Sequence, residues 1–245
     1  MLELAYRYLL HRRNLRAVCR IEERICEAAA ASGEDFKLDT DAARSVHDNL
    51  ATRAHWLDKI KVRTTYDSIR VEAVWRRPIA LIKMGLNKCY VDSNLTVLDY
   101  IPISELPIVR VTGLSAVPPL PEPGQSWNEP DLSAAVDILV RLDRMDRLVT
   151  PDKPLLGEID RIDVANYNGR QDKRAGHVIL YAKEGVEIIW GAEYGKWQRH
   201  LESTDKQKIA KLYQHYKEYG TLLAGVKYVN LRDPQDDIPL PIDRF

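Results

Sequence analysis

The sequence predicts an α+β protein in which a small unit of helices on a short sheet is followed by a larger mixed β unit with helices. Three observations support this class. Apolar residues recur with a helical period before residue 60, the period changes to two between Ile60 and Trp75, and short apolar runs separated by turns follow from Lys88 onward. With 245 residues, 45% of them hydrophobic, the chain can form one large domain or two ordinary ones.

The first thirty residues have a helical pattern that ends at Ser32-Gly33. Arginines recur along this helix at helical spacing and alternate with glutamates: Arg12, Arg16, Arg20 and Arg24. The simplest interpretation is a solvated charged face, and the alternative is a surface that binds phosphates or lipid headgroups. A first strand at Arg16–Ile21 is a second interpretation of the same segment, because the pattern there is short.

A second helix is expected to begin at Asp39, Thr40 or Asp41, each of which can cap free N–H groups. Its apolar face would consist of Ala43, Val46, Leu50, Ala54 and Leu57. Two alternating runs, Ile60–Val62 and Ile69–Trp75, then predict a hairpin.

The prediction for the next segment is a hinge at Arg76, Arg77 and Pro78. Proline lacks the N–H group of a sheet ladder, so it favours an edge or a bulge where one unit passes into the next. We therefore divide the chain into a helical segment over 1–35, a small unit over 36–83, a β unit over 84–234 and a flexible tail over 235–245.

The β unit is predicted to contain two helices among its strands. The expected strands are Cys89–Asp92, Val97–Leu98, Ile108–Val111, Ile159–Val164, Val178–Ala182, Val186–Trp190 and Val226–Leu231. One helix would be capped by Asp131 or Ser133, with an apolar face of Leu132, Ala135, Val136, Leu139 and Leu142. The other would be capped by Ser203 or Thr204, stop at Gly220 and bury Ile209, Leu212, Tyr213 and Tyr216. A surface loop is expected at Pro118–Pro123, with a polyproline ligand as the alternative.

Composition and motifs favour a binding protein over an enzyme. Lys plus Arg and Asp plus Glu both number 36, so no global field favours nucleic acid or anionic membranes. A glycine-rich phosphate loop, a serine elbow and a zinc-protease motif are all missing. The three cysteines and the scattered histidines have no metal-ligand spacing, so neither metal nor cofactor is predicted.

Two alternatives to a binding protein of this kind remain open. A small hydrolase or ligand-binding enzyme would use Glu158, Asp160 and Asp163 as acid and base groups, although strand alternation directs these side chains mostly to water. A nucleic-acid or lipid-surface protein would act through the N-terminal arginines. No apolar run reaches the roughly 18 residues that a membrane helix needs, and we expect no export signal at Met1–Leu10.

In their order along the chain, several stretches resemble the extracytoplasmic part of the bacterial cell-division family FtsQ, also called DivIB. They are Trp56–Arg63, Ile69–Trp75, Arg77–Ala80, Tyr90–Asp92, Leu106–Ile108, Lys208–Tyr219 and Tyr228–Arg232. Gly124–Trp127 and Ile188–Gly191 are similar to versions of the family from planctomycete-like bacteria. The similarity spans about Asp39–Pro234. The sequence departs from the family in lacking a membrane helix and in having Ser93-Asn94 where a turn glycine is usual.

The resemblance implies a POTRA domain at the small unit, followed by the family's β domain. It further implies a non-catalytic scaffold of the division machinery that binds membrane partners of the FtsB and FtsL type at the septum. Such a protein lies at the cell envelope, on the extracytoplasmic side of the inner membrane. We expect it to be held there by an N-terminal anchor upstream of this sequence or by its partners.

The resemblance also implies where a partner would bind. An uncapped last strand can accept a partner's strand through backbone hydrogen bonds. Tyr228, Asn230 and Arg232 would then face the partner, and Val229 and Leu231 would anchor the strand to the core. Tyr213, Lys217 and Tyr219 on the preceding helix are weaker candidates. At the hinge, Arg76 and Arg77 would either hold its shape or contact a second partner.

Overall fold

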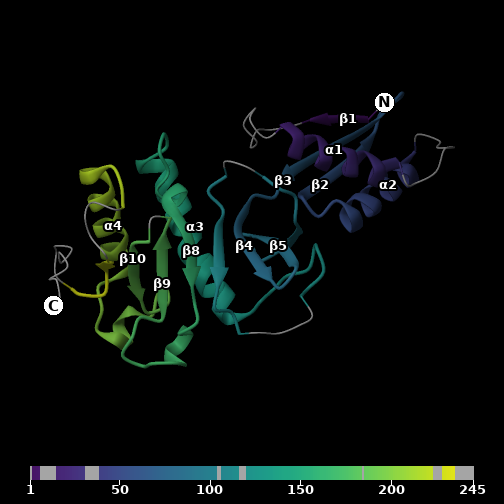
Figure 1. The fold of residues 1–245 in the computed structure, drawn as a ribbon. Helices are drawn as coiled ribbons and strands as arrows, with labels where there is room; N and C mark the ends of the chain where they lie inside the picture. Colours follow the sequence, from purple (N-terminus) through teal and green to yellow (C-terminus); the bar gives the residue numbers. More distant parts are fainter. Residues whose placement is uncertain are drawn as a thin grey trace.

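The structure, a computed structural model, describes residues 2–5, 15–30, 39–103, 106–115, 120–183, 185–222 and 228–234. These residues form one sheet of three strands and one of eight, together with helices α1 to α4, which confirms the α+β class (Figure 1). None of the described helices is long and apolar enough to cross a membrane. The predictions for the tail over 235–245, for Arg12 and for Pro118-Pro119 fall outside the described residues.

The small sheet has the order β1-β3-β2, in which β1 (Leu2–Ala5) is parallel and β2 (Leu57–Thr64) antiparallel to β3 (Ile69–Trp75). Helices α1 (Leu15–Ala30) and α2 (Thr40–Arg53) connect β1 to β2. The alternative that placed a first strand at Arg16–Ile21 is wrong, because that segment belongs to α1 and the first strand lies nearer the N-terminus.

Helix α2 begins where one of the three predicted caps lies. The carboxylate of Asp39 accepts hydrogen bonds from the N–H groups of Asp41 and Ala42. Val46, Leu50, Ala54 and Leu57 are buried as predicted, although the last two follow the end of the helix at Arg53. Ala42 is also buried, whereas Ala43 is only partly buried. The helix therefore packs on β2 of the small sheet through the predicted stripe.

The large sheet has the order β11-β10-β9-β8-β7-β4-β5-β6. Its strands are β4 (Pro78–Met84), β5 (Asn87–Asp92), β6 (Val97–Asp99), β7 (Val109–Thr112), β8 (Ile159–Asp163), β9 (Val178–Ala182), β10 (Glu187–Gly191) and β11 (Tyr228–Asn230). The pairs β4–β7, β7–β8 and β10–β11 are parallel, and the others are antiparallel. The chain changes sheets between β3 and β4, at the predicted hinge.

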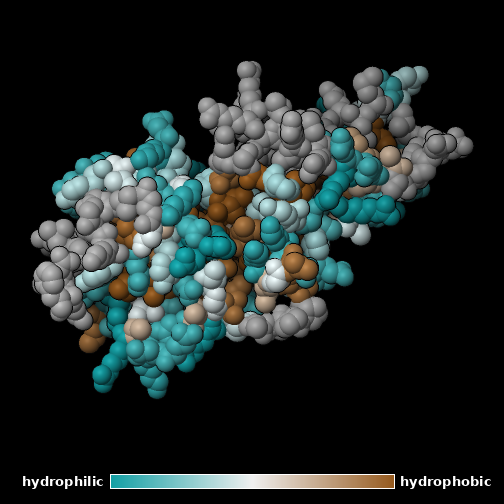
Figure 2. All heavy atoms as spheres, viewed as in Figure 1, coloured by the Kyte–Doolittle hydropathy of each residue, from teal (hydrophilic) through white to brown (hydrophobic). Residues whose placement is uncertain are grey.

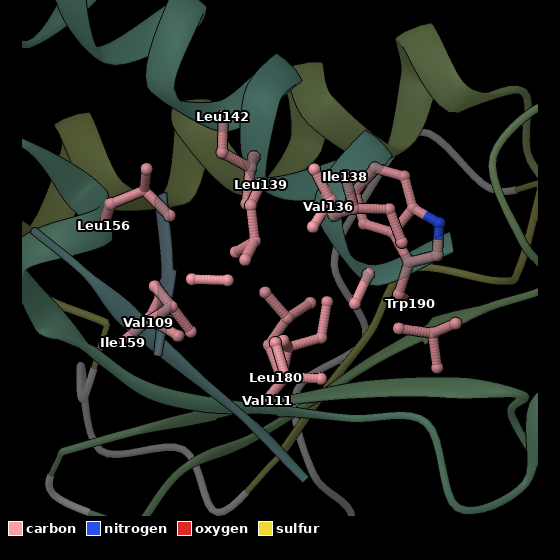
Figure 3. Close-up of a cluster of buried hydrophobic side chains, with 14 of the residues drawn as sticks. Val109, Val111, Val136, Ile138, Leu139, Leu142, Leu156, Ile159, Leu180 and Trp190 are labelled. Carbon is pink, nitrogen blue, oxygen red and sulfur yellow. The ribbon is translucent and has the colours of Figure 1, made fainter. Parts of the chain in front are cut away.

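Helices α3 (Pro130–Val149) and α4 (Asp205–Tyr219) lie over one face of the large sheet (Figure 1). In Figure 3, Leu139 and Leu142 of α3 point toward the strands that carry Val111 and Leu180, and Trp190 of β10 lies beside Ile138. All five residues of the predicted α3 face are buried. The predicted cap of α3 is wrong, because Glu129 occupies the cap position, and the carboxylate of Asp131 accepts hydrogen bonds from Ser115 instead.

A second apolar core lies under α1 and α2 and extends into the large sheet. Trp56 and Leu50 pack there with Tyr90 of β5 and Leu98 of β6. The indole N–H of Trp56 donates to Asp99 Oδ1 at 3.0 Å. On the face shown in Figure 2, an apolar strip runs down the middle of the view between more hydrophilic regions. The two sheets therefore share packing at the β5–β6 end of the large sheet.

Candidate partner-binding edge

Strand β11 lies at one end of the large sheet, as predicted for the last strand. It pairs in parallel with β10, and Val229 lies opposite Ile188. Among the described strands, none pairs with the other side of β11. A strand in this position presents backbone groups that another chain can use.

The backbone of β11 alternates between its neighbour and the outer edge. The N–H of Leu231 donates to the carbonyl of Ile189 at 3.0 Å, so the odd-numbered residues turn their backbone groups toward β10. The intervening residues, Tyr228 and Asn230, turn theirs away. The side chains of Val229 and Leu231 are fully buried, whereas Tyr228 is 37% exposed, which agrees with the predicted division into anchors and outward-facing residues.

The C-terminal end of the edge is closed by contacts within the chain. The carbonyl of Arg232 accepts a hydrogen bond from Ser203 N–H at 2.7 Å, and Lys211 Nζ donates to the carbonyl of Asp233 at 2.6 Å. The amide oxygen of Asn230 accepts from Arg232 N–H at 3.0 Å. The outer backbone available to a partner is therefore limited to Tyr228–Asn230.

A buried group of charges holds this end of the sheet. Glu202 accepts hydrogen bonds from Lys208 Nζ at 2.6 Å, from Arg232 Nε at 2.8 Å and from Ala192 N–H at 2.9 Å. Lys208 is completely buried. Burial lowers the pKa of Lys208 below its ordinary value, although the hydrogen bond from Lys208 to Glu202 opposes that shift. The carboxylate of Glu202 thus ties the end of β10 to α4 and to Arg232, two residues after the end of β11.

Two of the predicted partner-binding residues have other roles in the structure. Tyr213 is buried, and its hydroxyl donates hydrogen bonds toward Leu142 and Asp146 of α3, so it holds α4 in place and does not face the surface. Arg232 is engaged by Glu202, so its guanidinium anchors the strand end. The two other helix candidates do reach the surface: Lys217 is exposed, and Tyr219 is 50% exposed.

The hinge residues contact both sheets. Arg76 donates to Asp58 of β2 at 3.0 Å and to Asp92 of β5 at 2.9 Å. Arg77 forms an ion pair with Asp143 of α3 at 2.9 Å. Pro78 begins β4 opposite Asp92. These contacts favour the interpretation in which the two arginines hold the shape of the junction.

The three carboxylates of the rival enzyme hypothesis are each held by a neighbour. Glu158 pairs with Lys153 at 3.0 Å, and its other oxygen accepts from Leu222 N–H. Burial acts to raise the pKa of Glu158, but these contacts lower it overall below its ordinary value, opposite to the rise that a general acid needs. Asp160 pairs with Arg110 at 2.7 Å, and Asp163 accepts from the hydroxyl of Thr112 at 2.8 Å.

The structure also brings together three of the residues that are scattered in the sequence. One ligand atom each from His177, Glu193 and His200 lies within 4.8 Å of the other two. His177 precedes the β9–β10 hairpin, whereas Glu193 and His200 follow it, so their spacing matches no short metal-binding motif. Only the pairing of β9 with β10, combined with the loop after β10, makes them neighbours.

No family model matches the sequence, and no curated protein matches it significantly.

Proposed function

We propose that the chain is a non-catalytic scaffold that binds an extended segment of a partner by strand addition at β11. The observation that carries this proposal is the position of β11 at the end of the large sheet, with the backbone groups of Tyr228 and Asn230 directed away from β10. An added strand would pair with those groups and extend the sheet.

The size of the edge limits the affinity that the backbone can supply. A net contribution of about 0.5–1.5 kcal/mol for each hydrogen bond gives only a modest total over three residues. Side chains near the edge must therefore supply selectivity, and Tyr228 is the exposed aromatic residue on the strand itself. Lys217 and Tyr219 at the end of α4 are further candidates on exposed surface.

The resemblance to the FtsQ family supports a specific partner class. On this proposal the chain works at the division septum, on the extracytoplasmic side of the inner membrane, and binds membrane proteins of the FtsB and FtsL type. The order β1-α1-α2-β2-β3 in the small unit is compatible with the POTRA domain that the resemblance implies. Membrane association would come from an anchor upstream of this sequence or from the partners.

A proline substitution tests strand addition directly. In Tyr228→Pro the outward N–H is removed, while the hydrogen bonds between β11 and β10 remain. The matched control is Tyr228→Ala, which removes the same side chain but keeps the N–H. Binding to purified extracytoplasmic segments of FtsB-type and FtsL-type proteins, measured by isothermal titration calorimetry, should be lost in Tyr228→Pro and only weakened in Tyr228→Ala.

A second pair of changes tests the same edge through its side chains. The double variant Tyr228→Lys with Asn230→Lys places two charges on the outward positions and should abolish capture of the partner while the far-ultraviolet circular dichroism stays unchanged. If Tyr228→Pro and the double variant bind the partner segment as tightly as the unmodified chain does, the docking of a strand at β11 is refuted. Absence of binding between the unmodified chain and either partner segment would refute the division role.

A further inference from the structure

Three polar side chains meet beyond one end of the β9–β10 hairpin. His177 directly precedes β9, Glu193 follows β10, and His200 ends the short 3₁₀ helix η4 (Trp197–His200). One ligand atom from each lies within 4.8 Å of the other two, and the rings of His177 and His200 are in edge contact with centroids 4.6 Å apart. His177 and Glu193 are 4% and 3% exposed, and His200 lies nearer the surface.

Glu193 has one oxygen that the described residues leave without a partner. Its Oε1 accepts a hydrogen bond from Asn168 N–H at 2.7 Å and lies 3.2 Å from Nδ1 of His177. Its Oε2 is buried and, within the described parts of the chain, has no hydrogen-bond partner. A buried carboxylate oxygen in this state costs free energy, and native proteins normally compensate for it with a donor, a water molecule or an ion.

The loop that carries Asn168 is held firmly by the side chain of Asn166. The amide group of Asn166 accepts hydrogen bonds from Gln171 and Asp172 N–H and donates to the carbonyls of Asp172 and Gly176. Asn168 adopts a φ of 56°, which aims its N–H at Glu193. The carboxylate is thus oriented by a backbone group, as metal-bound carboxylates in proteins commonly are.

We propose that His177, Glu193 and His200 bind one divalent transition-metal ion, with zinc as the first choice. Two imidazoles and one carboxylate form a donor set that suits zinc and leaves one tetrahedral position for water. Ligand atoms about 2.0–2.2 Å from zinc lie roughly 3.3 Å from one another in a tetrahedral site. His177 Nδ1 and Glu193 Oε1 are already 3.2 Å apart, and the three ligand atoms lie within 4.8 Å of one another, so binding requires the more distant atoms to approach by up to roughly 1.5 Å. Rotation of the Glu193 carboxylate would bring its unpartnered Oε2 to the ion.

The ion would fix the end of the sheet that carries β11. It would link the β9–β10 hairpin to η4, and Glu193 immediately follows Ala192, whose N–H donates to the buried Glu202. The site therefore stabilises the same region as the Glu202–Lys208–Arg232 group. It does not depend on which partner β11 binds.

Metal titration of the purified full chain tests the site. After removal of metals with a chelator, isothermal titration calorimetry with zinc chloride should show one equivalent bound, and zinc should raise the melting temperature. Cobalt(II) at one equivalent should give the intense visible absorption of a tetrahedral complex. His200→Ala should weaken zinc binding at least about 10-fold through the loss of a direct ligand, and Glu193→Gln should do the same because it removes the negative charge.

His47→Ala is the matched control, because His47 is a solvent-exposed histidine on α2 outside the cluster. It should bind zinc as the unmodified chain does. Because His200 lies nearer the surface, His200→Ala keeps the test meaningful even if variants at the two buried positions fold poorly. Absence of a one-equivalent zinc site, or equal zinc affinity in His200→Ala and His47→Ala, would overturn the proposal and leave an ordinary hydrogen bond between His177 and Glu193.

Discussion

Gly191 is the residue whose identity the buried charges restrict most directly. It ends β10 with a φ of +97°, and a Cβ built there would overlap Oε2 of Glu202 and the Cγ of Arg232. The same carboxylate oxygen receives Lys208 and the N–H of Ala192. A side chain at Gly191 would therefore disturb the group that ties β10 to α4 and to the end of β11.

Gly191→Ala is expected to lower the free energy of unfolding by at least about 2 kcal/mol, because backbone strain adds to the displacement of Glu202. Gly195→Ala is the matched control: Gly195 has a φ of +80°, but nothing lies within 4 Å of the added Cβ. Gly195→Ala should lower the free energy of unfolding by only about 1 kcal/mol. Urea unfolding followed by fluorescence measures the free energy of unfolding of both variants. Equal destabilisation by Gly191→Ala and Gly195→Ala would show that Glu202 can move away from the added methyl group.

Individual residues were predictable where the chemistry is local. Asp39 and Thr204 cap their helices because a short polar side chain reaches N–H groups within the first turn, and Thr204 also forms a capping box with Gln207. The sequence has Ser93-Asn94 where the FtsQ family has a turn glycine, and in the structure Leu95 has the positive φ of this turn, 62°. Local propensity could not reveal that Asp92 accepts hydrogen bonds from two N–H groups of this turn.

At the scale of elements, one aromatic residue of helix α4 forms hydrogen bonds with α3. The hydroxyl of Tyr213 donates toward the carbonyl of Leu142 at 2.8 Å and toward Asp146 Oδ1 at 2.7 Å. Asp146 also accepts hydrogen bonds from Leu155 and Leu156 N–H, so it joins the C-terminal part of α3 to the segment before β8. Burial and the nearby Asp146 raise the pKa of Tyr213, which keeps the hydroxyl protonated as a donor.

Tyr213→Phe should therefore lower the free energy of unfolding by about 1–2 kcal/mol, because it removes the hydroxyl and keeps the ring. Tyr219→Phe is the matched control on the same helix, since Tyr219 is half exposed, and it should change stability by less than about 0.5 kcal/mol. Thermal unfolding by circular dichroism compares the two. A Tyr213→Phe protein as stable as the control would mean that water replaces the hydroxyl at Asp146.

Most elements were predictable from periodicity, whereas their neighbours in the sheets were not. The five buried residues of the α3 face and the alternation along β9 and β11 follow directly from sequence spacing. The strand at Leu2–Ala5 was missed because four residues are too few for a period to emerge. Its pairing with β3, like the meeting of His177, Glu193 and His200, depends on contacts between distant parts of the chain.

On the scale of the whole molecule, the two sheets are joined by a shared core and by a partly buried arginine, Arg76. Tyr90 and Leu98 of the large sheet pack in the core under α1 and α2. The rings of Tyr90 and Trp56 meet edge to face, with their centroids 6.0 Å apart. Arg76 bridges Asp58 and Asp92, and its N–H donates to the carbonyl of Trp56. The sequence indicated a junction at this point, but not that its arginine would be bound from both sides.

Arg76→Ala should uncouple the two sheets and lower the free energy of unfolding by about 2–4 kcal/mol, because it leaves the buried Asp92 without its charged partner. Arg110→Ala is the control: it breaks an ion pair whose side chains are both 40% exposed, and should lower the free energy of unfolding by at most about 1 kcal/mol.

Hydrogen exchange followed by mass spectrometry shows which part of the molecule Arg76→Ala destabilises. In Arg76→Ala, amides of β2 and β3 should exchange faster than those of β8 and β9, since the small unit has the smaller core and loses its tie to the large sheet. Equal acceleration in both sheets would mean that the two cores still unfold as one unit and that the packing around Tyr90, not Arg76, joins them.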